Sequence, residues 1–202
     1  AYTNLAGALA FLERFDEASE KMNKGLDILT DLADQKGHSK ARMHLMFNLL
    51  NKSMLMCNLN NLSQAIEASD QALELVQTMI QQEDRMEMRT WVGAVNVRKG
   101  TVYRHFTDYS KALVFIDQGI KVLKNLIQVE GLFEPLKELF YAYGEKAEIL
   151  ESMGDLTGSI EFLNQAIHEF DQYEAQYQGQ ELLKSKKDFQ AKRDEVQGRL
   201  NG

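Results

Sequence analysis

Few residues of this sequence are of the types that carry catalysis, and those few are poorly placed to cooperate. Cys57 is the single cysteine, and a thiol becomes a nucleophile only when a neighbouring base or positive charge favours its thiolate. The one candidate base for it is His105, much further along the chain. Because a cysteine on a helix is more often a small buried apolar side chain, the sequence predicts no catalytic thiol.

Metal and phosphate chemistry lack their usual patterns as well. His38 and His44 lie near the start of a predicted helix, whereas His105 and His168 lie far from them and from each other. Metal sites use His, Cys, Asp or Glu at short, fixed spacings, and phosphate loops need clustered glycines after a strand. The sequence has neither pattern, so we predict that the protein is not an enzyme and uses no metal and no cofactor.

One group of charged residues does have a regular spacing. Glu145, Glu148 and Glu151 recur every third residue, which on an α-helix places them along one face. Such a stripe is usually a solvated face. On an inner surface it would instead attract lysine or arginine side chains of a partner.

Composition restricts the class of protein. The net charge is -7, which argues against general binding of nucleic acid, because contacts to phosphates need an excess of Lys and Arg. No apolar run approaches the ~20 residues that span a membrane. A single cysteine forms no internal disulfide and favours a reducing compartment, so we predict a cytoplasmic location. The one proline, Pro135, favours long, uninterrupted helices.

The elements that would position any site follow an internal repeat. Four segments share a pattern of a large apolar residue, two polar or small residues, and then Ala or Ser. The small residue that ends the pattern recurs every 47 positions, at Ala18, Ala65, Ala112 and Ser159. A register that holds over four copies without a gap predicts one structural unit per copy, each stacked on its neighbours.

Other positions keep the same register. Small residues recur in two further columns, at Ala6, Ser53, Gly100 and Ala147, and at Gly25, Ala72, Gly119 and Ala166. Large residues recur at Leu9, Met56, Tyr103 and Leu150. Small residues at fixed places on two successive helices let their backbones approach closely, and the large residues then fill the gaps between neighbouring units. This is the pattern of a helical solenoid with a continuous core.

The repeat also predicts the helices. We expect pairs at 2–12 with 15–36, 40–58 with 62–83, 86–105 with 108–130, and 134–152 with 155–178. Asn61, Asp108 and Asp155 stand just before the second helix of their pairs, where a short polar side chain can accept hydrogen bonds from exposed backbone N–H groups. Arg14 holds that position in the first pair and is the exception.

The far ends of the second helices share a signal too. Gly37, Asp84 and Gly131 follow those helices at the same spacing of 47 residues. A residue in the left-handed conformation closes many helices at this point, and we predict that role for all three.

These features resemble the tetratricopeptide repeat family. The resemblance rests on a small residue, a large residue three positions later, a polar turn, and then aromatic-x-x-Ala followed by a later Ala-Leu. Asn4 to Leu26 and Tyr103 to Ile120 match it best. The ordinary unit has about 34 residues, so the copies here resemble long-helix variants of the family. The resemblance implies an all-α fold: a right-handed superhelical α-solenoid of four helix pairs with a C-terminal capping helix.

The predicted domain organisation is a single solenoid over residues 1–202. Its units are about 1–37, 38–84, 85–131 and 132–179, and a charged helix follows at 180–200. The sequence starts part-way into the first helix of the repeat, so we expect it to be a fragment of a longer protein. The last helix has a sparse apolar stripe, Leu182, Phe189, Val196 and Leu200. This stripe either caps the last repeat or forms a dimer seam or a linker to another domain.

The resemblance also implies where a ligand binds. In this family the first helix of each pair lines the concave inner face. Thr3, Gly7, Ala10 and Asn58 fall on this face by register, and the predicted partner-binding residues are Phe11, Phe47, Leu50, Asn51, Met54, Arg98, Thr101, Arg104, His105, Tyr141, Glu145 and Glu148. The face would run from apolar through basic to acidic. Phe47, Leu50 and Met54 have packing as an alternative role.

The predicted function is therefore protein–protein interaction. The chain would act as a scaffold or docking module that binds a peptide or helix of a partner in the concave groove, as the regulatory part of a larger protein. The alternative is a receptor for a small-molecule or peptide signal that changes the curvature of the solenoid. The family's clamp for chaperone carboxylates is not expected, because Thr3 and Gly7 stand where that clamp needs Lys and Asn.

Overall fold

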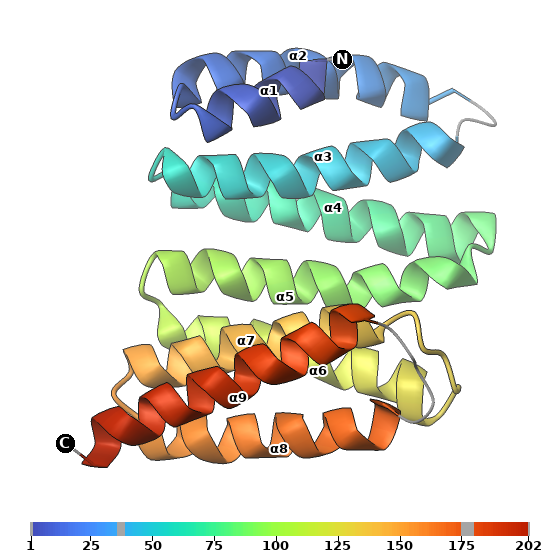
Figure 1. Cartoon of the computed structure of the whole chain (residues 1–202). Coiled ribbons are helices and arrows are strands. Elements are labelled where there is room, and N and C mark those ends of the chain that lie inside the picture. Colours follow the sequence, from blue (N-terminus) through green and yellow to red (C-terminus); the bar gives the residue numbers. More distant parts are fainter. Residues whose placement is uncertain (1, 36–38, 175–179, 202) are drawn as a thin grey trace.

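The computed structural model describes residues 2–35, 39–174 and 180–201 (Figure 1), and these residues contain α-helices, one 3-10 turn and no β-strand. The helices are α1 Tyr2–Phe11, α2 Phe15–Ala33, α3 Ser39–Asn58, α4 Leu62–Glu83, α5 Arg89–His105, α6 Tyr109–Gln128, α7 Leu136–Ser152, α8 Leu156–Glu174 and α9 Gln180–Asn201. The 3-10 turn, η1 Met86–Met88, precedes α5. The predicted all-α solenoid of four helix pairs with a capping helix is confirmed.

The ends of the helices have the predicted caps. Asn61, Asp108 and Asp155 each accept a hydrogen bond from the backbone N–H three residues later, at 3.1, 3.2 and 2.8 Å. Arg14 makes no such bond. Asp84 and Gly131 have φ values of 54° and 70° and close α4 and α6 in the left-handed region. Gly37 lies outside the described residues.

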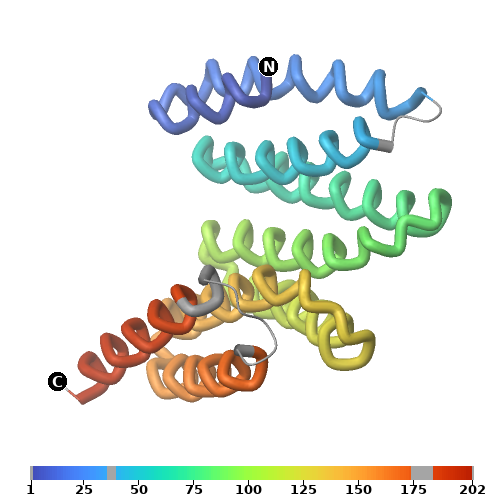
Figure 2. The backbone as a smooth tube through the Cα atoms, turned by 45° about the vertical axis from the view of Figure 1, so that its right-hand side comes forward, coloured from blue at the N-terminus to red at the C-terminus, as the bar shows by residue number. Residues whose placement is uncertain are grey.

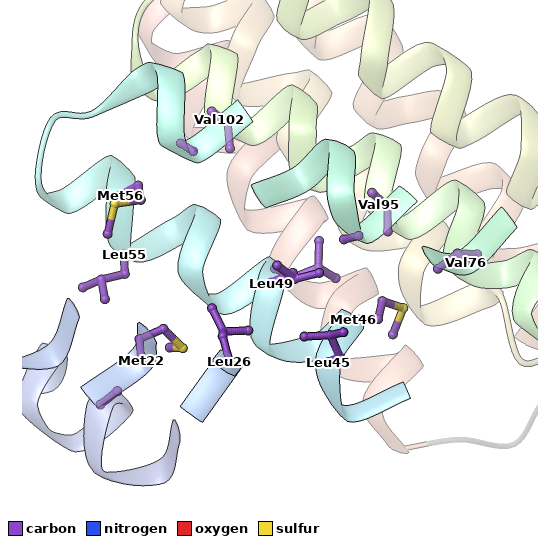
Figure 3. Close-up of a cluster of buried hydrophobic side chains, with 14 of the residues drawn as sticks. Met22, Leu26, Leu45, Met46, Leu49, Leu55, Met56, Val76, Val95 and Val102 are labelled. Atoms are coloured by element: carbon purple, nitrogen blue, oxygen red, sulfur yellow. The ribbon is translucent and has the colours of Figure 1, made fainter. Parts of the chain in front are cut away.

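The helix pairs stack in chain order to form the solenoid (Figure 2). Each second helix packs on the first helix of its own pair and on the first helix of the next pair. The largest apolar cluster joins α1 to α5, and Figure 3 shows Leu26 of α2 beside Leu45 and Leu49 of α3. A second cluster joins α5 to α9. Helix α5 contributes to both clusters, so the core is continuous along the stack.

A repeated ion pair links successive units. Lys99 of α5 lies 2.5 Å from Asp70 of α4, and Lys146 of α7 lies 2.7 Å from Asp117 of α6. The two lysines are 47 residues apart in the sequence, and so are the two aspartates. Each ammonium group also lies over a phenylalanine ring of its own pair. Contacts between successive units therefore repeat with the same 47-residue spacing as the sequence pattern.

Helix α9 covers the last pair and occupies the position that the first helix of a fifth pair would have. Val196 is fully buried, and it continues the column of buried residues Leu55, Val102 and Ile149 at the same spacing. The Phe189 ring lies 5.5 Å from that of Phe170 on α8. Val196 and Phe189 of the apolar stripe thus pack within the chain, as predicted for a capping helix. Leu200 remains exposed, and the side chain of Leu182 lies outside the described residues.

Candidate functional site

The first helices α1, α3, α5 and α7 make up the predicted inner face, and a hollow lies between α1 and α3 on this face. This inner hollow has a volume of about 260 Å³. Its rim contains six residues that the sequence placed on this face: Thr3, Gly7, Ala10, Asn51, Met54 and Asn58. Its floor includes Met22 and Leu55, which Figure 3 labels in the core cluster. The sequence prediction missed these two, because it considered neither second helices nor the buried side of α3.

The rim of the inner hollow is uncharged but able to form hydrogen bonds. Asn51 and Asn58 are exposed, and seven residues of separation place them two turns apart on one face of α3. Neither carboxamide makes a hydrogen bond within the described part of the chain. Each amide can both donate and accept a hydrogen bond, and Met54 between them offers a flexible apolar contact. This combination suits a segment of polypeptide, whose backbone presents donors and acceptors of its own.

The charged half of the inner face is already paired within the chain. The Arg98 guanidinium lies over the Tyr141 ring, 4.8 Å from its centroid. Arg104 lies 3.1 Å from Glu145 and 3.0 Å from Glu148. The predicted change from basic to acidic side chains is present, and the contacts between α5 and α7 pair Arg104 with the two glutamates, whereas Arg98 contacts a neutral ring. A partner would have to displace these contacts to use the charges.

Three of the predicted partner-binding residues support this face from beneath. Leu50, Thr101 and Glu145 are each at most 8% exposed, and the Thr101 hydroxyl donates to the Val97 carbonyl at 3.2 Å. Phe47 packs edge-on against Trp91 at 4.6 Å between centroids. Leu50 and Phe47 therefore pack within the chain, which was the alternative to a role in partner binding.

The two remaining predicted residues lie near helix ends. Phe11 is the last residue of α1 and is 88% exposed. His105 is exposed at the end of α5 and its ring lies 5.2 Å from that of Phe106. The inner hollow therefore brings together Asn51 and Met54 with α1, and includes neither Phe11, Phe47 nor Tyr141.

Cys57 belongs to the apolar core and is 1% exposed. Burial raises the pKa of its thiol to about 11, so at neutral pH it is held as the unreactive thiol. We expect the native protein to react with a thiol reagent such as dithionitrobenzoate at least about 100-fold more slowly than the urea-unfolded chain. Fast labelling of the native protein would mean that the core around Cys57 opens readily.

Metal-binding and membrane-spanning features are absent from the described residues. No group of three or more His, Cys, Asp or Glu in the described ranges is arranged to hold a metal ion. No helix in the part of the chain that the structure describes is long and apolar enough to cross a membrane.

The chain is a helical repeat solenoid. Residues 140–168 match the model of the tetratricopeptide repeat, which confirms the resemblance that the sequence predicted. The matched region lies in the fourth unit, whereas the segments that were predicted to match best, Asn4 to Leu26 and Tyr103 to Ile120, lie in the first and third units. No curated protein matches the chain.

Solved structures of tetratricopeptide-like proteins share this fold. BtubC (BKLC) from P. vanneervenii is 20% identical with a TM-score of 0.60, over 82% of this chain and 60% of that one. TPR-like repeats of a putative kinesin light chain from Podosopora anserina give 15% identity and a TM-score of 0.59, covering 95% and 94% of the two chains. A variant of those repeats gives 14% identity and a TM-score of 0.61, covering 99% and 90%. At these identities the likeness concerns the fold alone, and this chain spans only 60% of the BtubC structure.

Proposed function

We propose that this chain is a protein-interaction scaffold that docks a peptide or helix of a partner protein on its inner face, in a regulatory role. The observation that carries the proposal is the inner hollow, where the unpaired amides of Asn51 and Asn58 flank Met54. Tetratricopeptide-type repeats generally serve as interaction scaffolds. A cytoplasmic location fits the one, buried cysteine but remains a prediction.

The chemistry of the inner face indicates how a partner would bind. The hollow itself is lined by neutral residues, and Arg104 on the neighbouring part of the face is paired with Glu145 and Glu148. Affinity then comes from hydrogen bonds to the asparagines and from apolar contact with Met54. We therefore expect binding that changes little with salt concentration, because the residues that line the hollow carry no charge.

A test of the proposal fills the inner hollow without disturbing the fold. A β-carbon built on Gly7 has no atom within 4 Å, so Gly7→Trp can place an indole in the hollow while α1 keeps its backbone. Gly198→Trp on α9 is the matched control, because its β-carbon is equally unobstructed. The parent chain and both variants would be used to capture partners from native extract, with circular dichroism as a check of folding.

We expect one protein to be captured by the parent and by Gly198→Trp and to be lost with Gly7→Trp. Retention by both variants would place the interface on another surface and refute docking in the inner hollow. Capture of nothing by the parent would make a receptor for a small-molecule signal the leading function.

A further inference from the structure

A larger hollow lies on the outer side of the solenoid. This outer hollow has a volume of about 880 Å³ and is formed by α5 and α6. Its floor is Val92 and Asn96, and its wall includes Gln118, Lys121, Val122 and Asn125. The volume falls within the range of clefts that bind ligands, about 300 to 1,000 Å³. It exceeds what one side chain fills, so a segment of polypeptide fits it.

The outer hollow does not belong to the inner face. Successive residues of an α-helix are turned by about 100°. Asn96 therefore lies roughly 180° around α5 from His105 and roughly 160° from Arg98. A ligand in the outer hollow would touch the opposite side of α5 from one bound at the inner face. A site in the outer hollow is thus independent of the proposed function.

The outer hollow has a counterpart one repeat earlier. A smaller hollow of about 360 Å³ lies between α3 and α4. Six of its residues stand 47 positions before residues of the outer hollow, namely Leu45, Leu49, Gln71, Glu74, Leu75 and Thr78. The cleft is thus a property of the repeat. Its chemistry differs between units, because Leu49 is replaced by Asn96 and Glu74 by Lys121.

The fourth unit shows which side chains fit this position. There the residue equivalent to Asn96 is Tyr143, which is 1% exposed, and the residue equivalent to Val122 is Glu169. The Tyr143 hydroxyl donates to the Glu169 carboxylate, which also lies 2.7 Å from Lys124. In this unit the chain fills its own cleft with a phenol and a carboxylate that pairs with a lysine. The third unit has a smaller residue at the same place and remains hollow.

The charges on the rim favour an acidic ligand. Arg89 is paired with Glu130 at 2.6 Å, and Lys124 is paired with Glu169. Lys121 has no ion-pair partner among the residues that the structure describes. The unpaired charge that faces a ligand is therefore positive, in a chain whose net charge is -7. At the counterpart hollow the same position is Glu74, which would repel an acidic segment.

We propose that the outer hollow docks an acidic segment of a partner protein, which inserts one tyrosine ring over Val92 and Asn96 and places a carboxylate on Lys121. The ring takes the volume that Tyr143 takes one unit later. The Asn96 amide nitrogen donates to the Val92 carbonyl at 2.7 Å, and the amide oxygen can accept a hydrogen bond from the phenol. The apolar contact supplies most of the affinity, and the charge selects acidic partners over basic ones.

The test uses a fluorescein-labelled synthetic peptide of about 15 residues, long enough to become helical when bound, built from Ala and Glu with one central tyrosine. Its binding to the chain would be followed by fluorescence anisotropy. Asn96→Tyr fills the hollow with the residue that the fourth unit has at this position. Lys121→Glu changes only an exposed side chain, so it reports on binding even if Asn96→Tyr is poorly folded. Leu49→Tyr at the counterpart hollow and Gly7→Trp at the inner hollow are the controls.

We expect saturable binding to the parent that is weakened about tenfold or more by Asn96→Tyr and by tyrosine-to-alanine exchange in the peptide. Lys121→Glu should weaken it by about fivefold, as for one exposed ion pair turned repulsive. Leu49→Tyr and Gly7→Trp should leave the affinity within about twofold. Absence of saturable binding, equal binding by Lys121→Glu, or loss with Gly7→Trp would each overturn the proposal. The last result would place the peptide on the inner face.

Discussion

Replacement of Gly119 by alanine is expected to lower the free energy of unfolding by about 2 kcal/mol, although alanine favours helices more than glycine does. A β-carbon on Gly119 would lie 2.5 Å from the Val97 side chain and 2.8 Å from the Gly93 carbonyl oxygen. The carbonyl belongs to the backbone of α5, so it cannot move aside cheaply. The added methyl group therefore pushes α5 and α6 apart and loosens the packing between them. Urea unfolding followed by circular dichroism measures the effect.

The same exchange at an unobstructed helical glycine should have the opposite sign. Gly7→Ala and Gly198→Ala place a methyl group where no atom lies within 4 Å. Each should raise the stability by a few tenths of a kcal/mol and up to about 1 kcal/mol, because alanine restricts the unfolded chain and favours the helix. If Gly119→Ala were as stabilising as these two controls, close approach of α5 and α6 would not be what requires a small residue at position 119.

Replacement of Glu169 by alanine is expected to cost about 3 kcal/mol of unfolding free energy. Glu169 is 7% exposed, and its carboxylate accepts hydrogen bonds from Tyr143, from Lys124 at 2.7 Å and from Gln165 at 3.1 Å. Its removal leaves the Tyr143 hydroxyl buried without an acceptor and Lys124 without its partner. Lys124 is partly exposed, so solvent screens its share of the cost. Glu161→Ala, an exposed change on the same helix, should change the stability by less than about 0.5 kcal/mol.

The same network predicts a dependence on alkaline pH. Burial raises the pKa of Tyr143 well above its usual value, and the Glu169 carboxylate raises it further. The folded protein therefore keeps the phenol protonated while the unfolded chain loses that proton near pH 10. Stability from this group is complete below about pH 10 and is lost as the pH rises further, by up to about 1.4 kcal/mol per pH unit. Tyr143→Phe should show a shallower loss of stability above pH 10, and identical slopes would contradict a buried, hydrogen-bonded phenol.

Much of the fold could be predicted because its information is local and repeated. One spacing of 47 residues located the helices, and short polar residues such as Asn61 and Asp108 marked where second helices begin. Gly119 and its equivalents marked where helices approach closely. The pattern of small and large residues acts through nearest neighbours, so it does not depend on the curvature of the whole stack.

The candidate site was harder to predict because it depends on contacts between units. The register placed Arg104 and Glu145 on the inner face, but only the structure shows that α5 and α7 bring them within 3.1 Å of each other. Leu50 and Val97 fall in the same sequence column as Thr3, yet both are buried whereas Thr3 is partly exposed. The volume of the side chains in the next unit decides whether equivalent residues are exposed or buried. A repeat pattern in the sequence does not specify that volume.

The outer hollow illustrates this limit most clearly. Asn96 and Tyr143 occupy equivalent positions in the repeat, and the difference in volume between their side chains leaves one unit hollow and the next one filled. An asparagine at this position in the sequence alone looks like an ordinary polar residue on a helix. Comparison of the four units column by column, with attention to volume rather than polarity, would have indicated it.

Site-specific photo-crosslinking tests most directly whether the inner face docks a partner protein. A benzoylphenylalanine would replace Phe11, an exposed aromatic residue that follows Ala10 of the inner hollow but does not line it, or, as the control, Glu161 on the exposed side of α8. After irradiation in native extract, we expect a discrete crosslinked protein from position 11 and none from position 161. A crosslinked protein from position 161, with none from position 11, would contradict docking on the inner face.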